Sequence, residues 1–267
     1  MTMPESRESI LAAYYHTLYR AWGRQHWWPA QSRFEVIVGA FLTQNTAWIN
    51  VEHAMRNLRQ ARALSLAAMR RIPRRQLEQL VRPAGYFRQK AQRLKNFVVW
   101  LDRRHGGSLD RLFARPTAAL REELLALNGV GPETADSILL YAGGHPAFVV
   151  DAYTRRVLHR HRILPHDADY EDIRALFERA LEDEPAPQPA APAPRTWNSH
   201  PPSRMSTTVR HSSAQNFNEM HGLIVNVGKY HCRKKAPVCE ACPLRSFLPA
   251  RGPRALPGGS PRKKPSD

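Results

Sequence analysis

Apolar residues recur along most of this chain at the three- and four-residue spacing of amphipathic helices, and the alternating pattern of strands is almost absent. Residues 8–23 predict a first helix, whose apolar stripe consists of Ile10, Leu11, Tyr14, Leu18 and Trp22. Residues 33–44 are apolar nearly all round, which favours a buried helix. Further helices are predicted near 50–62, 74–82, 88–104, 117–127, 132–142, 152–160 and 170–182. The sequence therefore predicts an all-α protein.

Two stretches depart from this pattern. Residues 184–213 are rich in Pro, Ala and Ser and contain few large apolar side chains, and residues 249–267 are similar and basic. Such segments bury too little surface to offset the conformational entropy of an ordered chain. We expect a disordered insertion over 184–213 and a disordered basic tail over 249–267.

The chain is strongly basic. It carries 40 Lys and Arg against 23 Asp and Glu, a formal net charge of +17. A surplus of this size favours a polyanionic partner, because each phosphate that Lys or Arg neutralises releases a condensed counterion. A genome rich in G and C, in which Arg replaces Lys freely, would give the same surplus, so the charge alone leaves both explanations open.

The sequence shows no membrane span, signal peptide or disulfide framework, and this bears on where in the cell the protein is expected. No apolar run approaches the roughly 20 residues that span a bilayer, and the acidic start of the chain has no apolar core of a signal peptide. All three cysteines fall within 232–242, which is not the pattern of a secreted disulfide framework. We expect a monomeric protein of the bacterial cytoplasm, associated with the nucleoid and without a membrane partner.

Residues 127–142, LNGVGPETADSILLYA, contain a glycine-rich turn between two predicted helices. The turn consists of Asn128, Gly129, Val130 and Gly131. Its two glycines allow positive φ and close approach of a partner, and Pro132 suits the first turn of the following helix. Main-chain N–H groups at such a helix start can bind a phosphate. An ordinary corner between two helices would show the same pattern.

An aspartate follows this hairpin at a characteristic place. Asp151 ends the apolar run of residues 147–150 and stands at the start of the helix predicted over 152–160. A carboxylate in this position commonly does no more than cap the helix. However, the succession of hairpin, short loop, apolar run and aspartate resembles endonuclease III and its relatives, the helix-hairpin-helix DNA glycosylases. The resemblance covers nearly all of 30–182 and 216–248.

The resemblance implies a two-lobed helical fold that binds double-stranded DNA in the cleft between its lobes. The first lobe would be a helical barrel over 34–145 that contains the helix-hairpin-helix motif 127–142. The second lobe would combine residues 1–33, 146–182 and 216–248, the last of which includes the cysteine loop 232–242. The hairpin would contact the DNA backbone.

In that family the aspartate that matches Asp151 is essential. It stabilises the oxocarbenium ion that develops at the sugar and orients the attacking water, or assists an amine nucleophile, much as carboxylates do in glycoside hydrolysis. The bifunctional members also use a lysine of the second hairpin helix as a Schiff-base nucleophile. Here that position holds Glu133. The resemblance therefore implies a monofunctional glycosylase that uses water and leaves an abasic site.

The base pocket and the DNA wedge are predicted from residues 27–51. Gln44 and Asn45 match the family loop that fills the gap left by a flipped base, although they could equally be a polar cluster at a helix start. The tryptophans Trp27, Trp28 and Trp48 resemble the aromatic residues that sandwich the extruded base in the bacterial 3-methyladenine branch. A cationic alkylated purine over an indole gains roughly 0.5–2 kcal/mol. Buried tryptophans are, however, also ordinary core residues.

The spacing of Cys232, Cys239 and Cys242 matches the first three ligands of the family's 4Fe–4S loop, whereas Leu248 occupies the fourth position. Since four thiolates normally hold such a cluster, three alternatives stay open: a three-cysteine cluster, a loop that has lost its cluster, and a zinc ion. Lys229, in the basic segment 221–237, is expected to contact a phosphate. It also matches a lysine that lies near the aspartate in the 3-methyladenine branch.

The sequence thus predicts a monofunctional DNA glycosylase of base excision repair that acts on an alkylated purine. Two alternatives remain. The first is an endonuclease III-like glycosylase and abasic-site lyase for oxidised pyrimidines. The second is a DNA-binding helix-hairpin-helix protein without catalytic activity.

Overall fold

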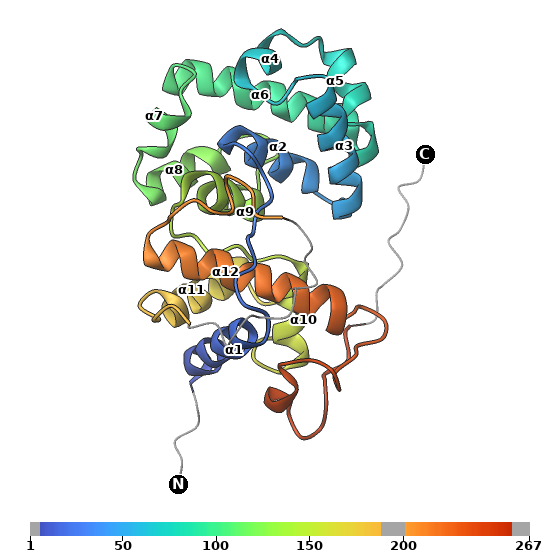
Figure 1. Ribbon diagram of the computed structural model, residues 1–267, viewed down its shortest axis with the longest axis vertical. Helices are drawn as coiled ribbons and strands as arrows, with labels where there is room; N and C mark the ends of the chain where they lie inside the picture. The colour runs from blue at the N-terminus through green and yellow to red at the C-terminus, as the bar shows by residue number, and fades with distance from the viewer. Residues whose placement is uncertain (1–5, 188–200, 258–267) are drawn as a thin grey trace.

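The computed structural model describes residues 6–187 and 201–257, and its regular elements are all helices (Figure 1). These residues contain no strand, so the prediction of an all-α protein is confirmed. Within the same two ranges, none of the helices combines the length and the apolar character that crossing a membrane requires.

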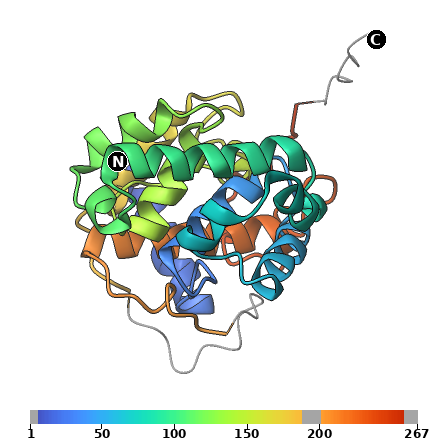
Figure 2. The same cartoon turned by 90° about the horizontal axis from the view of Figure 1, so that it is seen from above.

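The helices form two groups, one above the other in Figure 1. The upper group comprises α2 (Arg33–Thr43), α3 (Trp48–Gln60), α4 (Leu66–Arg71), α5 (Arg74–Leu80), η1 (Arg82–Ala84), α6 (Phe87–His105), α7 (Leu109–Phe113), α8 (Thr117–Leu125), α9 (Pro132–Ser137) and η2 (Ile138–Gly143). The lower group comprises α1 (Arg7–Trp22), α10 (Ala152–Arg160), α11 (Tyr170–Leu181), α12 (Ser212–Asn226), η3 (Val227–His231) and η4 (Arg245–Phe247). Figure 2 looks down on the upper group and shows the long α6 crossing its end.

Local sequence explains where several helices begin. Ser32, Ser65 and Ser108 each accept a hydrogen bond from a backbone N–H three residues ahead, and so cap α2, α4 and α7. Asp151 does the same for α10, whose bounds are those expected from the sequence. The helices α4 and α7 were not predicted, because six and five residues are too few to display a helical period.

The helix α2 is the centre of the upper group. Its residues from Phe34 to Leu42 are all buried, as the apolar pattern predicted. It packs against α3, α6, α9 and η2. In the lower group, α1 packs against α11 and α12. The pocket described below lies where these two groups meet.

Of the segment 184–213, for which the sequence predicts disorder, the structure describes residues 184–187 and 201–213, and both parts form hydrogen bonds with the rest of the chain. The Met205 N–H donates to the carbonyl of Ala30 at 3.0 Å, and the Ala30 N–H donates to the hydroxyl of Ser203 at 3.1 Å. Serine side chains therefore supply the hydrogen bonds that a segment without a helix or strand otherwise lacks. The prediction for residues 188–200 falls outside the described part of the chain.

Residues 249–257 of the tail 249–267, for which the sequence also predicts disorder, form hydrogen bonds with α10. The Arg254 N–H donates to the carbonyl of Arg160 at 3.0 Å. The ring Nε2 of His159 lies 2.8 Å from the carbonyl of Ala255. The end of α10 thus offers hydrogen-bond partners that composition cannot reveal. Residues 258–267 lie outside the described range.

Candidate active site

A pocket of about 640 Å³ opens between the two groups of helices. This volume falls within the roughly 300–1,000 Å³ of typical ligand sites. The pocket brings together most of the residues that the sequence singled out, namely Trp27, Trp28, Gln44, Asn45, Trp48, Gly131, Asp151 and Lys229. The remaining hairpin residues Asn128, Gly129 and Val130 are not part of its lining, and the three cysteines line a different pocket.

Asp151 caps α10 and lines the pocket at the same time. Its Oδ1 accepts hydrogen bonds from the backbone N–H of Thr154 at 2.8 Å and from the Thr154 hydroxyl at 3.0 Å. Its Oδ2 takes no part in the cap and lies 3.7 Å from Nε2 of His221. One carboxylate oxygen is therefore fixed by the helix, and the other remains available to the pocket.

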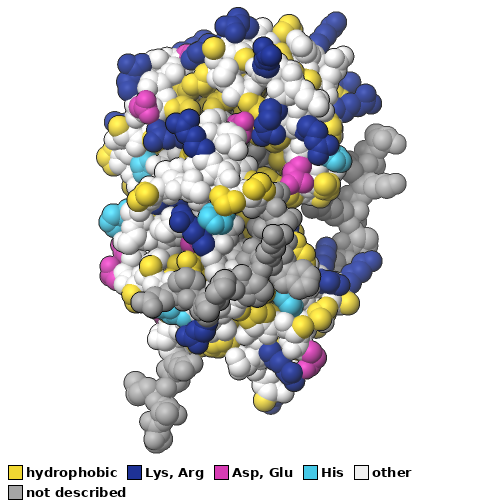
Figure 3. Space-filling model, in the orientation of Figure 1, with side chains coloured by type: hydrophobic (Ala, Val, Ile, Leu, Met, Phe, Trp, Pro, Cys, Tyr) yellow, Lys and Arg dark blue, Asp and Glu magenta, His cyan; other side chains and the backbone are white. Residues whose placement is uncertain are grey.

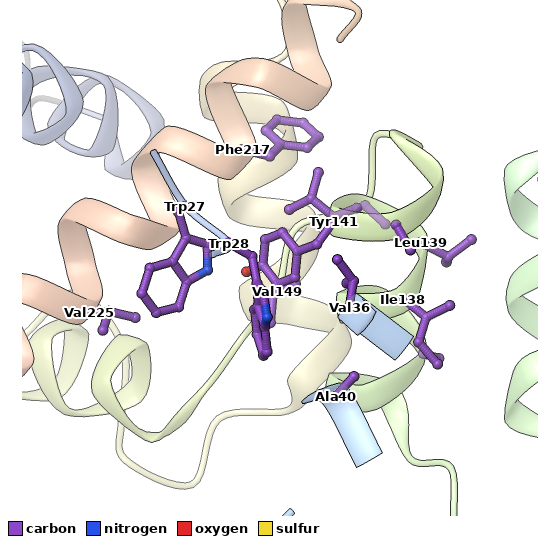
Figure 4. Close-up of a cluster of buried hydrophobic side chains, with 14 of the residues drawn as sticks. Trp27, Trp28, Val36, Ala40, Ile138, Leu139, Tyr141, Val149, Phe217 and Val225 are labelled. Carbon is purple, nitrogen blue, oxygen red and sulfur yellow. The ribbon is translucent and has the colours of Figure 1, made fainter. Parts of the chain in front are cut away.

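Aromatic rings form one wall of the pocket. The rings of Trp28 and Trp48 meet edge to face with centroids 5.0 Å apart, and those of Trp27 and Trp28 lie 5.7 Å apart. Trp27 and Trp28 are buried and Trp48 is half-buried. Figure 4 shows Trp27, Trp28 and Tyr141 converging beside α2. These tryptophans are thus both core residues and pocket lining.

Gln44 braces the loop after α2 against the hairpin. Its Nε2 donates to the carbonyl of Gly129 at 2.8 Å and to the hydroxyl of Thr134 at 2.9 Å. Its Oε1 accepts from Nη1 of Arg93 at 2.5 Å. Asn45, by contrast, is exposed and has a positive φ of 52°. Gln44 and Asn45, for which the sequence predicts the same role, therefore have different surroundings.

A second carboxylate, Glu133, lines the same pocket. Its side chain is exposed to solvent. Even so, the protein atoms around its carboxyl remove part of its hydration, and together with the charge of Asp151 they raise its pKa from 4.5 to about 7. Burial also lowers the pKa of Lys229. The pocket thus holds two carboxyl groups and one amine.

Glu133→Gln should stabilise the protein in alkaline but not in acidic solution. A carboxyl whose pKa is raised on folding binds a proton in the folded state where the unfolded chain has lost it, so stability falls as the pH rises from 4.5 through 7. Glutamine does not ionise, so the variant does not lose stability over this pH range. Urea unfolding should give the variant a higher free energy of unfolding than the wild type at pH 8, and no difference below pH 4.5. A difference independent of pH would show that ionisation of Glu133 plays no part.

Sequence reasoning missed the residues that surround Asp151. His221, Tyr153 and Arg155 line the pocket with it. His221 belongs to α12, which starts at Ser212 inside the segment expected to be an insertion, and Met220 and Gly222 flank it in the sequence. The only signal was a histidine among apolar residues, which does not indicate what the ring faces.

The cysteine loop forms a separate pocket. Cys232, Cys239 and Cys242 line it together with His231 and Leu248. Leu248 offers no ligand atom, so the four-thiolate set of a cubane cluster is incomplete. Burial raises the pKa of the Cys242 thiol to about 11. Among the described residues, no group of three or more His, Cys, Asp or Glu side chains is arranged to hold a metal ion.

Two buried arginines of α10 attach this loop to the helix that begins after Asp151. Arg156 donates to the carbonyls of Cys232 at 2.6 Å and Gly228 at 2.9 Å. Arg160 donates to the carbonyls of Arg233 and Lys234 and lies 3.3 Å from Sγ of Cys232. These hydrogen bonds fix the loop against the end of α10.

Comparison with known proteins relates both the sequence and the fold to DNA repair. The family model of HhH-GPD superfamily base excision DNA repair proteins matches residues 38–183. A protein of Methanocaldococcus jannaschii, named "Putative DNA repair glycosylase MJ1434", is 37% identical over 246 residues, which are 92% of this chain and 98% of that protein.

Two solved structures share the fold. The H. pylori 3-methyladenine DNA glycosylase MagIII, bound to 1,N6-ethenoadenine, has a TM-score of 0.63 and 28% identity, covering 83% of this chain and 96% of its own. A trapped covalent intermediate of endonuclease III with DNA has a TM-score of 0.65 and 20% identity, covering 91% of this chain and 96% of its own.

Proposed function

Because the chain belongs to the HhH-GPD superfamily of base excision DNA repair proteins, we propose that it is a monofunctional DNA glycosylase for alkylated purines. It hydrolyses the N-glycosidic bond of a base that is flipped out of double-stranded DNA and leaves an abasic site. The observation that supports this function is that Asp151 and three tryptophans line one pocket, in which Glu133 occupies the position of the Schiff-base lysine.

The tryptophan wall suits a cationic base. An N-alkylated purine carries positive charge, and an indole face attracts a cation by roughly 0.5–2 kcal/mol. Trp48 is half-buried, so part of its ring is accessible to a ligand. A cationic base is also a good leaving group, which lowers the demand for a proton donor. The similarity to the H. pylori 3-methyladenine DNA glycosylase supports this class of substrate.

Asp151 acts on the sugar. As the bond to the base breaks, positive charge develops on the sugar ring, and a fixed carboxylate stabilises that charge. Oδ2, which the helix cap leaves unused, is the oxygen that faces this charge and orients the attacking water. The N-terminal end of α10 adds a favourable dipole to the carboxylate.

The hairpin binds the DNA backbone through its main chain. Gly129 has a φ of +81°, which only glycine adopts readily. A Cβ atom on Gly131 would meet nothing within 4 Å, so this side of the turn is open to a phosphate. Asn45 enters the gap left by the flipped base, while Gln44 holds its loop against the hairpin.

Basic side chains surround the same opening. Arg93, Arg155 and Lys229 line the pocket, and Figure 3 shows further Lys and Arg side chains spread over the upper group of helices. Phosphate contacts of this kind fix the position of a protein on a duplex without reading its sequence. Such contacts would explain why the chain carries a large positive net charge.

An abasic-site lyase is the second candidate, because the Lys229 amine lies in the pocket and burial lowers its pKa. We expect the protein to release an alkylated base, to leave the strand intact until alkali is added, and to form no adduct under borohydride. An adduct that Lys229→Met abolishes, and that the remote Lys95→Met retains, would instead establish lyase chemistry.

A cluster on Cys232, Cys239 and Cys242 stays a prediction. Three thiols that line one pocket support this prediction, as does the Arg160 guanidinium group beside Cys232, whereas Leu248 does not supply the fourth ligand. No step of the proposed reaction depends on it. Protein purified without oxygen should absorb near 400 nm and contain iron and sulfide if a cluster is present. The monomeric state and the cytoplasmic, nucleoid-associated location also stay predictions.

A further inference from the structure

A line of buried polar groups leads from the aromatic wall to Asp151. The Tyr141 hydroxyl lies 2.7 Å from Nδ1 of His221, and Nε2 of His221 lies 3.7 Å from Oδ2 of Asp151. Figure 4 shows the Tyr141 hydroxyl directed toward Trp27. The three polar residues come from η2, from α12 and from the start of α10, so the tertiary fold alone brings them together.

The surroundings of His221 select one tautomer. Its Nε2 is buried and forms no hydrogen bond, and it faces the carboxylate of Asp151. An ionised carboxylate only accepts hydrogen bonds, so a proton on Nε2 is attracted to it, whereas a lone pair there would be repelled. With the proton on Nε2, Nδ1 accepts from the Tyr141 hydroxyl. Tyr141 thereby fixes the tautomer that directs an N–H group at Asp151.

His221 does this without a charge of its own. Its burial lowers the pKa of the imidazole, against a smaller opposing effect of the Asp151 charge. A neutral donor can orient a carboxylate while leaving its negative charge for the sugar. A lysine or arginine in the same place would neutralise the negative charge of Asp151. The oxocarbenium ion needs that negative charge for its stabilisation.

We propose that His221 is a positioning residue, which holds Oδ2 of Asp151 toward the sugar and is itself held by Tyr141. This inference rests on the proposed function. The distance of 3.7 Å exceeds that of a hydrogen bond. Catalytic hydrogen bonds are often long without substrate and shorten in the reacting complex, so Oδ2 closes on Nε2 when the nucleotide binds.

Single-turnover base release from an alkylated duplex tests this role. His221→Leu keeps the volume but removes the donor, and it should slow release about 10- to 100-fold, the loss typical of groups that orient a functional ligand. DNA affinity should not change. His221→Gln, whose amide can donate from the position of Nε2, should stay within about fivefold of the wild type. Tyr141→Phe should fall between the two.

A matched control separates positioning from general structural damage. His105 is also a buried histidine beside a carboxylate, with Nε2 3.0 Å from Oε2 of Glu123, but it does not line the pocket. His105→Leu should lose thermal stability and still release bases at the wild-type rate. The inference would be overturned if His105→Leu slowed base release as much as His221→Leu does. It would also be overturned if His221→Gln slowed base release as much as His221→Leu does.

Combination with Asp151→Asn distinguishes failure of the inference from failure of the proposed function. If His221 acts through Asp151, His221→Leu should slow the Asp151→Asn protein little further. A further loss as large as in the wild-type background would give His221 an independent role. If Asp151→Asn abolishes release and His221→Leu does not slow it, the inference fails and the function stands. If Asp151→Asn remains fully active, the function fails and the inference with it.

Discussion

Asp151→Asn should lower the rate of base release from alkylated duplex DNA by about 10³-fold, the size of a single preorganised electrostatic contribution to catalysis. The substitution removes the charge but keeps the shape of the side chain. Its amide oxygen can still accept the cap hydrogen bonds of Thr154, so stability should change by less than about 1 kcal/mol. DNA affinity should stay within a few-fold of the wild type. Single-turnover kinetics and fluorescence anisotropy measure the two quantities separately.

Asp169 offers a matched control for this experiment. It caps α11 by accepting a hydrogen bond from the backbone N–H of Glu171 at 2.8 Å, and it is exposed and outside the pocket. Asp169→Asn should therefore leave base release unchanged. If Asp151→Asn behaved like Asp169→Asn in both release and binding, the carboxylate would be only a cap. The hypothesis that the chain is a DNA-binding protein without catalytic activity would then be preferred.

Arg121→Met should lower the free energy of unfolding by about 3–5 kcal/mol, because it leaves a buried carboxylate without its cation. Asp136 is fully buried and accepts from Arg121 at 2.7 and 3.2 Å and from the hydroxyl of Tyr170 at 2.9 Å. Arg121 also pairs with Glu171. These contacts connect α8, α9 and α11. Urea unfolding at pH 7 measures the loss.

An exposed pair of the same chemistry provides the comparison. Arg70 contacts Asp102 through a fork of hydrogen bonds as short as 2.6 Å, but both side chains are well exposed. Exposed pairs contribute roughly 0–1 kcal/mol, so Arg70→Met should have little effect. Equal losses in Arg70→Met and Arg121→Met would mean that burial of Asp136 does not set the energy. Replacing both Arg121 and Asp136 by leucine should restore part of the stability.

Features encoded by neighbouring residues were predictable from the sequence. The bounds of α10 follow from an aspartate cap before an amphipathic run, and the burial of α2 follows from its apolar surface. The hairpin helix was predicted over 132–142 as one element. In the structure it changes at Ser137 from an α-helix to the wider turns of η2. Such a change depends on packing rather than on the apolar period.

Features that depend on distant residues were not predictable. Lys90 lies in the helix predicted near 88–104, and in the structure it is buried and donates to the carbonyls of Leu42 and Ala84 and to the Thr46 hydroxyl. Its partners lie up to 48 residues away in the chain. His221, which faces Asp151, follows the same rule, since it comes from α12, far from Asp151 in the chain. The sequence could indicate the carboxylate and its helix cap, but not the histidine that faces its other oxygen.

The most direct test of this account is the identity of the bases that the purified protein releases from methylated duplex DNA, determined by mass spectrometry alongside the length of the DNA strands. We expect free methylated purines and intact strands from the wild type, and almost none of these bases from Asp151→Asn. The proposed function would be contradicted if the protein released no base, or if it released only oxidised pyrimidines from oxidised DNA and cut the strand without alkali.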